Sequence, residues 1–372
     1  MAERKAFFGK AKRIVVKIGT NTITNGKGEV DGAFIKGIAG QAAKLRKEGK
    51  EIVIVTSGAI GCGKKELGLK ESPRDIVLRQ AAAAVGQSIL MSHYASAFRK
   101  RRISVAQVLL TFDSFSDRET YLNLRNSINS LLEFGVVPVI NENDPISTRE
   151  IDKSFGDNDR LSAMVASKLN ANALIMLSDV EGLFNCNPKK DSKAVLVREV
   201  KEIGKDIEAM AGNASCGGLG GMKSKVDAAK IAATAGCAVV ILNGRKKNAL
   251  LDAAAGKEIG TFFSPGKGLS EKERWLSFSR AAGTLEVDEG AKNALLSGKS
   301  LLAIGVKKVK GTFDANELVE VKCGSVVFAR GTSTYSSKDL EGIIGKNSGE
   351  GEKVLKQKLQ PVIKTENIYI IG

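Results

Sequence analysis

Short apolar runs rich in Val and Ile recur along about the first two thirds of this chain, and each ends in small or polar residues. Longer segments with helix-like spacing of apolar residues separate them. Because the runs are apolar almost throughout, they predict strands buried on both faces of a parallel sheet. The expected strands are RIVVKIGTN (13–21), EIVIVTSGAIG (51–61), ISVAQVLLT (103–111), VVPVINENDP (136–145), ALIMLSDVEGLF (173–184) and AVVILNG (238–244).

The intervening segments predict helices, so strand and helix alternate and indicate a doubly wound α/β domain with a mainly parallel sheet. Ligands of such domains bind beyond the carboxyl ends of the strands. The polar strand tails KIGTN, TSGA, NEND and LSDVEG are therefore the expected site. The expected helices cover residues 34–48, 76–101, 118–133, 160–169 and 223–235.

The pattern changes after Gly244, where GTFFSPGKG (260–268) is punctuated by Gly and Pro and reads as a joint. We expect a boundary near 265–272, with a first domain of residues 1–268 and a second of 272–372. Short strand-like runs dominate the second part and predict a small β-barrel-like domain with few helices. These runs are TLEVDEGA, SLLAIGVKKVKGTF, ELVEVKCG and SVVFARGTSTYSS.

Charge and cysteine content narrow the functional classes. The net charge of +16 favours polyanionic partners, but +13 of it lies in residues 1–269 and only +3 in 270–372, so there is no basic tail. Five cysteines form no CxxC pair, which argues against structural zinc and fits a reducing cytoplasm. The single histidine, His93, lies in a helix-like stretch, where we expect it on the surface. No apolar run reaches the ~18–20 residues of a membrane span.

Residues 216–225, CGGLGGMKSK, place four glycines ahead of two lysines. The stretch does not match the Walker P-loop, because Met222 stands where the glycine before Lys-Ser should be. It does not match GxGxxG either, because Lys223 replaces the third glycine. A glycine loop that leads into a helix can turn backbone N–H groups onto phosphate oxygens. By itself the pattern fits a linker equally well.

Lys17 interrupts an apolar strand just before a glycine, which suggests that its ammonium group reaches the strand end. A lysine at a sheet edge would also fit. Two acidic clusters, NEND (141–144) and GDND (156–159), lie in expected turns, where each alone could cap a helix. Together with Lys17 and Lys225 they favour phosphoryl transfer, which needs positioning and charge neutralisation more than covalent chemistry by the protein.

At this point the residues resemble a known family, the amino-acid kinases, and within it the glutamate 5-kinases. The likeness covers about residues 10–265, and the tail from about 275 is similar to a PUA domain through TLEVDEGAKNALLSGKSLLAIGV and FARGTSTYSS. The kinase-like stretches, in the family's order, are VVKIGTN, VTSGAIG, RQAAAAVGQS, VVPVINENDPIST, FGDNDRLSAMVAS, LSDVEGLF and GGLGGMKSKVDAAKIA.

The resemblance implies ATP-dependent phosphorylation of the side-chain carboxylate of L-glutamate to L-glutamyl 5-phosphate, the first step of proline biosynthesis. It implies Mg²⁺ carried on the nucleotide and not by protein ligands. Feedback inhibition by proline and a homodimer or homotetramer are implied as well. Because the product is labile, a glutamyl phosphate reductase is an expected partner.

The resemblance also implies a role for each matching residue. Lys17 and Lys225 would contact the transferring phosphoryl group, and Asp159 would orient both lysines. Ser57, Asp144 and Asn158 would hold glutamate. The residues expected to hold ATP are Lys17, Ser178, Asp179, Leu219, Gly220, Gly221, Met222, Lys223, Ser224 and Lys225.

Two departures and two alternatives remain. Leu219 stands where the family has threonine in a loop that looks one residue longer, which puts one contact to ATP in doubt. Ser178 replaces a threonine but keeps the hydroxyl. A sister kinase for N-acetylglutamate, uridylate or isopentenyl phosphate would share the fold. An RNA-binding protein with a secondary kinase core is the other alternative, since PUA domains bind RNA in modification enzymes and the sequence pI is about 9.5.

Overall fold

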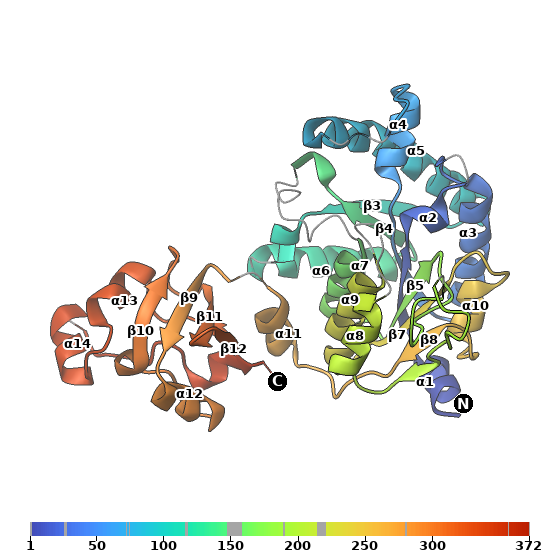
Figure 1. The fold of residues 1–372 in the computed structure, drawn as a ribbon. Helices are drawn as coiled ribbons and strands as arrows, with labels where there is room; N and C mark the ends of the chain where they lie inside the picture. The colour runs from blue at the N-terminus through green and yellow to red at the C-terminus, as the bar shows by residue number, and fades with distance from the viewer. Residues whose placement is uncertain are drawn as a thin grey trace. The chain divides into compact units, whose positions relative to one another are not determined.

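The computed structural model describes residues 2–25, 28–71, 73, 75–115, 118–146, 158–188, 190–213, 221–279, 281–355 and 357–371 (Figure 1). The chain forms two compact units. The first comprises Met1–Ser114 and Leu122–Leu269, and the second comprises Phe115–Tyr121 and Ser270–Gly372. The sequence-based limits of 1–268 and 272–372 remain a prediction, which limited proteolysis can test.

The first unit is built on an eight-stranded sheet with the order β3-β4-β2-β1-β5-β7-β8-β6. Neighbouring strands pair in parallel except β7 and β8, which are antiparallel. The predicted mainly parallel α/β fold is therefore confirmed. The strands are β1 (Arg13–Ile18), β2 (Glu51–Val55), β3 (Val105–Leu110), β4 (Val137–Glu142), β5 (Ala173–Ser178), β6 (Glu199–Val200), β7 (Ala238–Asn243) and β8 (Thr261–Phe263).

Helices cover both faces of this sheet. Figure 1 shows α6, α7, α8 and α9 on one side and α3 and α10 on the other. None of the helices that the structure describes is long and apolar enough to cross a membrane. The helices of the first two thirds of the chain are α1 (Ala2–Lys10), α2 (Thr20–Ile23), α3 (Gly32–Lys47), α4 (Ala59–Glu66), α5 (Ile76–Arg99), α6 (Arg118–Glu133), α7 (Asn158–Lys168), α8 (Lys205–Asn213), α9 (Met222–Thr234) and α10 (Ala249–Ala254).

Two sequence-based expectations were wrong here. The small-residue turn after β2 leads directly into a helix, α4, which packs on α5 at very short range: a Cβ on Gly63 would lie 1.7 Å from the carbonyl oxygen of Ala82. The alanine run of α5 thus serves close helix packing as well as helix propensity. The joint at 260–268 contains β8, because Phe263 is fully buried and the Thr261 hydroxyl donates to the carbonyl of Val197 at 2.7 Å.

The second unit carries a five-stranded sheet with the order β10-β9-β11-β12-β13 around its own apolar core. The expectation of few helices was wrong, since short helices flank its strands; Ser270 begins α11 with a capping box to Glu273. The elements are α11 (Glu271–Phe278), β9 (Gly283–Val287), α12 (Glu289–Leu296), β10 (Val306–Lys310), β11 (Leu318–Cys323), β12 (Val326–Thr332), α13 (Ser337–Ile343), α14 (Ser348–Leu355) and β13 (Ile368–Ile370).

The second unit also holds Phe115–Tyr121, which lies in the sequence between β3 and the body of α6. The carbonyl of Phe115 accepts a hydrogen bond of 2.9 Å from the hydroxyl of Ser279, and both groups are buried. The chain therefore leaves the first unit once, after β3, long before its final crossing near Leu269.

Candidate active site

The parallel strands β1, β2, β4, β5 and β7 end at one edge of the sheet, and polar side chains stand at or just after these ends. Because strand register aligns the ends, side chains that are far apart in sequence become neighbours there. The polar residues at this edge are Lys17, Ser57, Asn141, Ser178 and Asn243.

A buried ion cluster lies at this edge. Asp159, in the first turn of α7, is fully buried and pairs with the ammonium groups of Lys17 and Lys225. Lys225 Nζ lies 3.1 Å from Asp159 Oδ2, and the hydroxyl of Ser224 donates to the same oxygen at 3.2 Å. Lys17 is 4% exposed and Lys225 is 7% exposed. Two ammonium groups share one carboxylate, so the cluster keeps an excess positive charge in a poorly solvated place.

The helix termini at this cluster favour an anion as ligand. Lys225 lies in the first turn of α9, where the positive end of the helix dipole disfavours a cation. Gly221 is the N-cap of α9 and, as a glycine, supplies no side-chain oxygen to cap the helix. The first backbone N–H groups of α9 and the lysine charge therefore act in the same direction. An anion with several oxygens, such as a phosphate, would satisfy both.

Asn158, one residue before Asp159, joins the strand ends through its side-chain amide. Its Nδ2 lies 2.6 Å from the backbone oxygen of Thr56, 2.9 Å from Ser57 Oγ and 3.0 Å from Asn141 Oδ1. These contacts place polar groups from β2, β4 and α7 around one point beside the ion cluster. Such a group of amide and hydroxyl side chains can bind the polar end of a small molecule.

Ser178 and Asp179 follow β5. The hydroxyl of Ser178 donates to Asp179 Oδ1 at 3.2 Å, and Asn21 Nδ2 donates to Oδ2 at 2.9 Å. Burial alone would raise the pKa of Asp179, but these hydrogen bonds and the positive charge of Lys225 leave the pKa below its ordinary value. Asp179 is thus a carboxylate at neutral pH and presents acceptors only.

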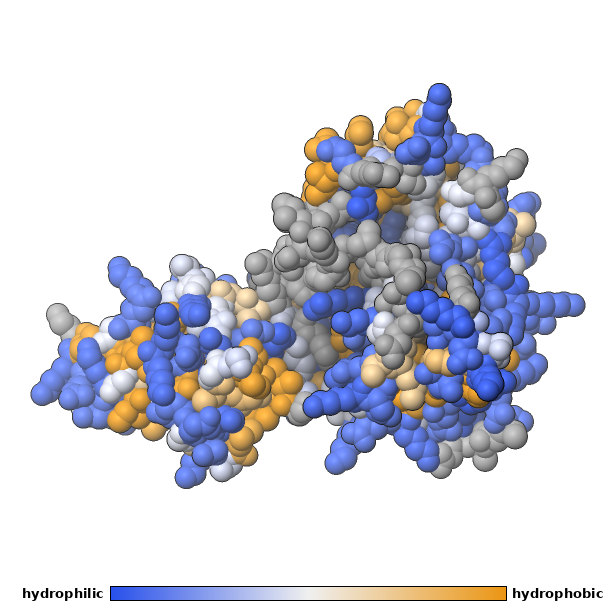
Figure 2. All heavy atoms as spheres, viewed as in Figure 1, coloured by the Kyte–Doolittle hydropathy of each residue, from blue (hydrophilic) through white to orange (hydrophobic). Residues whose placement is uncertain are grey.

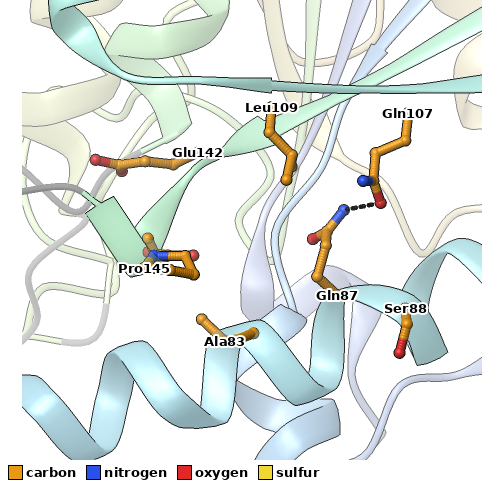
Figure 3. A pocket seen from close by; sticks show the side chains of 9 residues that line it. Ala83, Gln87, Ser88, Gln107, Leu109, Glu142 and Pro145 are labelled. Atoms are coloured by element: carbon orange, nitrogen blue, oxygen red, sulfur yellow. Dashed lines mark hydrogen bonds between the residues drawn. The ribbon is translucent and has the colours of Figure 1, made fainter.

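A cavity of about 300 Å³ opens between α5 and the β3–β4 side of the sheet (Figure 3). Its charged side chains, Glu142 and Asp144, are both acidic, so it suits a ligand with a positive or hydrogen-bond-donating group. Among the described residues, no three His, Cys, Asp or Glu side chains gather where they could hold a metal ion. The cavity is lined by Ala83, Ala84, Gln87, Ser88, Gln107, Leu109, Glu142, Asp144 and Pro145.

The structure brings several of the expected site residues together. Lys17, Asp159 and Lys225 form one cluster, and Ser57 is bonded to Asn158. Asp144 lines the cavity, three residues beyond the Asn141 partner of Asn158. These contacts establish proximity, and the roles of the residues in binding and catalysis remain predictions.

Other expected residues stand apart. Lys223 is exposed, unlike the buried Lys225 two positions later, and Met222 is half-buried at the start of α9. Leu219 and Gly220 lie outside the described residues. His93 is exposed on α5, as expected.

Sequence reasoning gave no individual role to three residues of this edge: Asn21, Thr56 and Asn141. All three stand inside the strand tails KIGTN, TSGA and NEND that mark the expected site, and that position was the available signal. Thr56 takes part through its backbone oxygen, which no residue type reveals.

Comparison with known proteins identifies the family of this chain. Residues 12–243 match the model of the amino acid kinase family, and residues 283–355 match that of the PUA domain. The chain belongs to the amino acid kinase family. Within that family it groups with proteins named glutamate 5-kinase, one from Methanosarcina mazei (50% identical, 100% of this chain and 99% of the relative) and one from Geobacter sulfurreducens (42%, 99% and 100%).

A solved amino acid kinase structure supports the fold. The carbamate kinase of Giardia lamblia bound to AMP-PNP matches 69% of this chain and 99% of its own, with a TM-score of 0.50 and 17% identity. The predicted kinase fold, the PUA domain and the assignment as a kinase are therefore confirmed.

Proposed function

We propose that this kinase transfers the γ-phosphate of ATP to the side-chain carboxylate of L-glutamate and forms L-glutamyl 5-phosphate, the first step of proline biosynthesis. The observation that carries the proposal is the buried cluster in which Asp159 holds Lys17 and Lys225 together at the ligand-binding edge of the sheet. The full-length relatives named glutamate 5-kinase support this acceptor.

In this mechanism Lys17 and Lys225 neutralise the transferring phosphoryl group. A carboxylate oxygen of glutamate forms a bond to the γ-phosphorus, while the bond from that phosphorus to the β,γ-bridging oxygen breaks and leaves its electrons on ADP. Asp159 holds both ammonium groups in place. No general base is required, because the acceptor carboxylate is already ionised at neutral pH.

ATP would lie over the start of α9, with its phosphates toward the first backbone N–H groups of that helix and Lys225. The ATP-binding set would be Lys17, Ser178, Asp179 and the loop from Leu219 to Lys225, as the resemblance implies. Mg²⁺ would be carried on the nucleotide phosphates, where it adds charge neutralisation.

Glutamate would be held by Ser57, Asp144 and Asn158. The carboxylate of Asp144 lines the cavity and suits an α-ammonium group. An acylated amine, as in N-acetylglutamate, lacks the positive charge that would favour this position.

The test is ATP consumption with Mg²⁺ against L-glutamate, N-acetyl-L-glutamate, uridylate and isopentenyl phosphate, with hydroxylamine present to trap an acyl phosphate as hydroxamate. We expect turnover and hydroxamate with L-glutamate alone. For a variant of Lys225, Lys230→Met is the matched control, since Lys230 is an exposed lysine of the same helix, α9, and pairs with Glu208. Turnover with another acceptor, or with none, would overturn the proposal.

RNA binding by the second unit is a second candidate function. Lys307, Lys308 and Lys310 are exposed along β10, an edge strand of the five-stranded sheet, and would suit a phosphate backbone. RNA affinity that falls steeply with salt, and that a triple Lys→Glu variant at these positions removes, would support it. Affinity unchanged by that variant would exclude this strand.

We further propose a homodimer or homotetramer. Apolar side chains at the start of α5 and the end of α4 support this, because Leu67, Val77 and Leu78 are 47%, 65% and 51% exposed. Figure 2 shows hydrophobic side chains over this part of the molecule. Sedimentation of the wild type and of Leu78→Glu tests it: a smaller species is expected for the variant.

Feedback inhibition by proline, transfer of the product to a glutamyl phosphate reductase and a cytoplasmic location complete the proposal. They follow from the resemblance, from the lability of an acyl phosphate and from the cysteine usage. Inhibition is checked by adding proline to the hydroxamate assay at subsaturating glutamate.

A further inference from the structure

Four side-chain amides form a continuous hydrogen-bonded chain from the candidate active site to the cavity. Asn158 Nδ2 lies 3.0 Å from Asn141 Oδ1, Asn141 Nδ2 lies 2.9 Å from Gln87 Oε1, and Gln87 Nε2 lies 3.1 Å from Gln107 Oε1. Figure 3 shows Gln87 of α5 pointing toward Gln107 of β3 with this last bond dashed. Asn141 and Gln87 are buried, and Gln107 is exposed.

The backbone carbonyl of Thr56 sets the direction of every hydrogen bond in this chain of amides. Asn158 Nδ2 also lies 2.6 Å from the backbone oxygen of Thr56, and a backbone carbonyl can only accept. The NH₂ group of Asn158 must therefore face Thr56 and Asn141. Asn141 then accepts with its oxygen and donates to Gln87, which accepts in turn and donates to Gln107. Rotating any one amide by half a turn would set donor against donor or acceptor against acceptor.

The consequence appears at the inner end of the chain. Asn158 Oδ1 is buried and has no hydrogen-bond partner among the residues that the structure describes. A buried acceptor left unsatisfied is costly, and the fixed direction prevents Asn158 from turning its NH₂ group there instead. A ligand with a hydrogen-bond donor would satisfy this acceptor.

We propose that Gln87 and Gln107 are positioning residues that act through Asn141 to hold the Asn158 oxygen toward the bound substrate, where it accepts a hydrogen bond from the substrate's ammonium group. The inference rests on the proposed function, in which the phosphoryl acceptor is an amino acid. It adds two residues outside the expected substrate-binding set and gives Asn158 a defined polarity as an acceptor.

Two substitutions at position 87 test the bond to Asn141. Gln87→Glu keeps an acceptor opposite Asn141 Nδ2, and the exposed Gln107 amide can turn its NH₂ group toward the new carboxylate, so the amide chain survives. Gln87→Met leaves Asn141 Nδ2 without this acceptor and breaks the amide chain. Gln107→Glu keeps an acceptor opposite Gln87 Nε2, so the amide chain survives there as well.

The experiment measures KM for L-glutamate and kcat by ADP release, with urea denaturation as a check on folding. For Gln87→Met we expect KM relative to the wild type to rise about tenfold, with kcat changed much less. For Gln87→Glu and Gln107→Glu the KM ratio should stay near one.

The outcomes separate this inference from the function on which it rests. A wild type that does not phosphorylate L-glutamate would overturn both. An active wild type whose KM for L-glutamate is matched by that of Gln87→Met would overturn the amide chain alone. Equal loss of kcat and of folding stability in all three variants would assign Gln87 a purely structural role, which also contradicts the inference.

Discussion

Removing Lys225 should lower activity strongly and stability only slightly, unlike the removal of one partner from an ordinary buried salt bridge. We expect Lys225→Met to lose about 10²–10³-fold in turnover, the usual effect of removing one preorganised electrostatic group. The free energy of unfolding should change by no more than about 1 kcal/mol. Asp159 retains Lys17 as its counter-ion, so no buried charge is left alone.

The magnitude follows from the geometry. At 3.1 Å and an effective dielectric constant of about 20, the attraction between Lys225 and Asp159 is roughly 5 kcal/mol. Lys17 pairs with the other oxygen of the same carboxylate, and repulsion between the two ammonium groups offsets part of this attraction. Desolvation of the Lys225 ammonium group costs about as much as the remainder. The lysine is therefore close to neutral for folding.

Asp159→Asn should behave in the opposite way. The change removes the carboxylate that two buried ammonium groups share, and the free energy of unfolding should fall by about 3–5 kcal/mol. Turnover should fall as well, because both lysines lose the group that holds them.

The assay is urea denaturation without nucleotide, followed by turnover with saturating ATP and L-glutamate, for the wild type, the two variants and the Lys230→Met control. The control should match the wild type in both measurements. The reasoning would be refuted if Lys225→Met lost more than about 2 kcal/mol of stability or kept normal turnover.

Two further predictions concern packing and pH. Gly63→Ala should destabilise the protein by more than about 2 kcal/mol, because the new methyl group meets the Ala82 carbonyl, whereas Gly37→Ala, with open space around an exposed helical position, should be neutral or stabilising in the same denaturation assay. The pKa of Asp31 lies below its usual value, since hydrogen bonds from Phe34 and Arg245 outweigh the effect of burial. Its contribution to stability is thus present above about pH 4 and is lost on acidification, so the urea midpoint of the wild type should fall faster between pH 5 and pH 3 than that of Asp31→Asn.

The sequence predicted the strands of the kinase fold well because both faces of the sheet are buried. A short run that is apolar at every position, with no alternation, is typical of a strand in such a sheet, and each predicted strand is present. The sequence predicted α4 and β8 poorly, because the first is built from small residues and the second is three residues long and stabilised by contacts such as that of Thr261 with Val197.

Some residues of the candidate site could be predicted from the sequence, and others could not. Lys17 stood out because a charge is out of place in a buried strand, and Asp159 because it belongs to an acidic cluster. Gln87 and Gln107 carried no such signal. A glutamine in a helix and another in a strand are ordinary residues until the fold brings the two amides within 3.1 Å. Long-range contacts of this kind depend on the topology and not on local pattern.

The segment Phe115–Tyr121 limits the order in which parts of the chain can fold during synthesis. It leaves the ribosome about 150 residues before the rest of the compact unit in which it packs. Its buried partner Ser279 emerges only with the start of that unit. A chain stopped at residue 269 would therefore carry an unanchored connection between β3 and α6, beside the strand that supplies Gln107 to the cavity. Premature termination near residue 269 should expose that connection to proteases, although most of the kinase sequence precedes the stop.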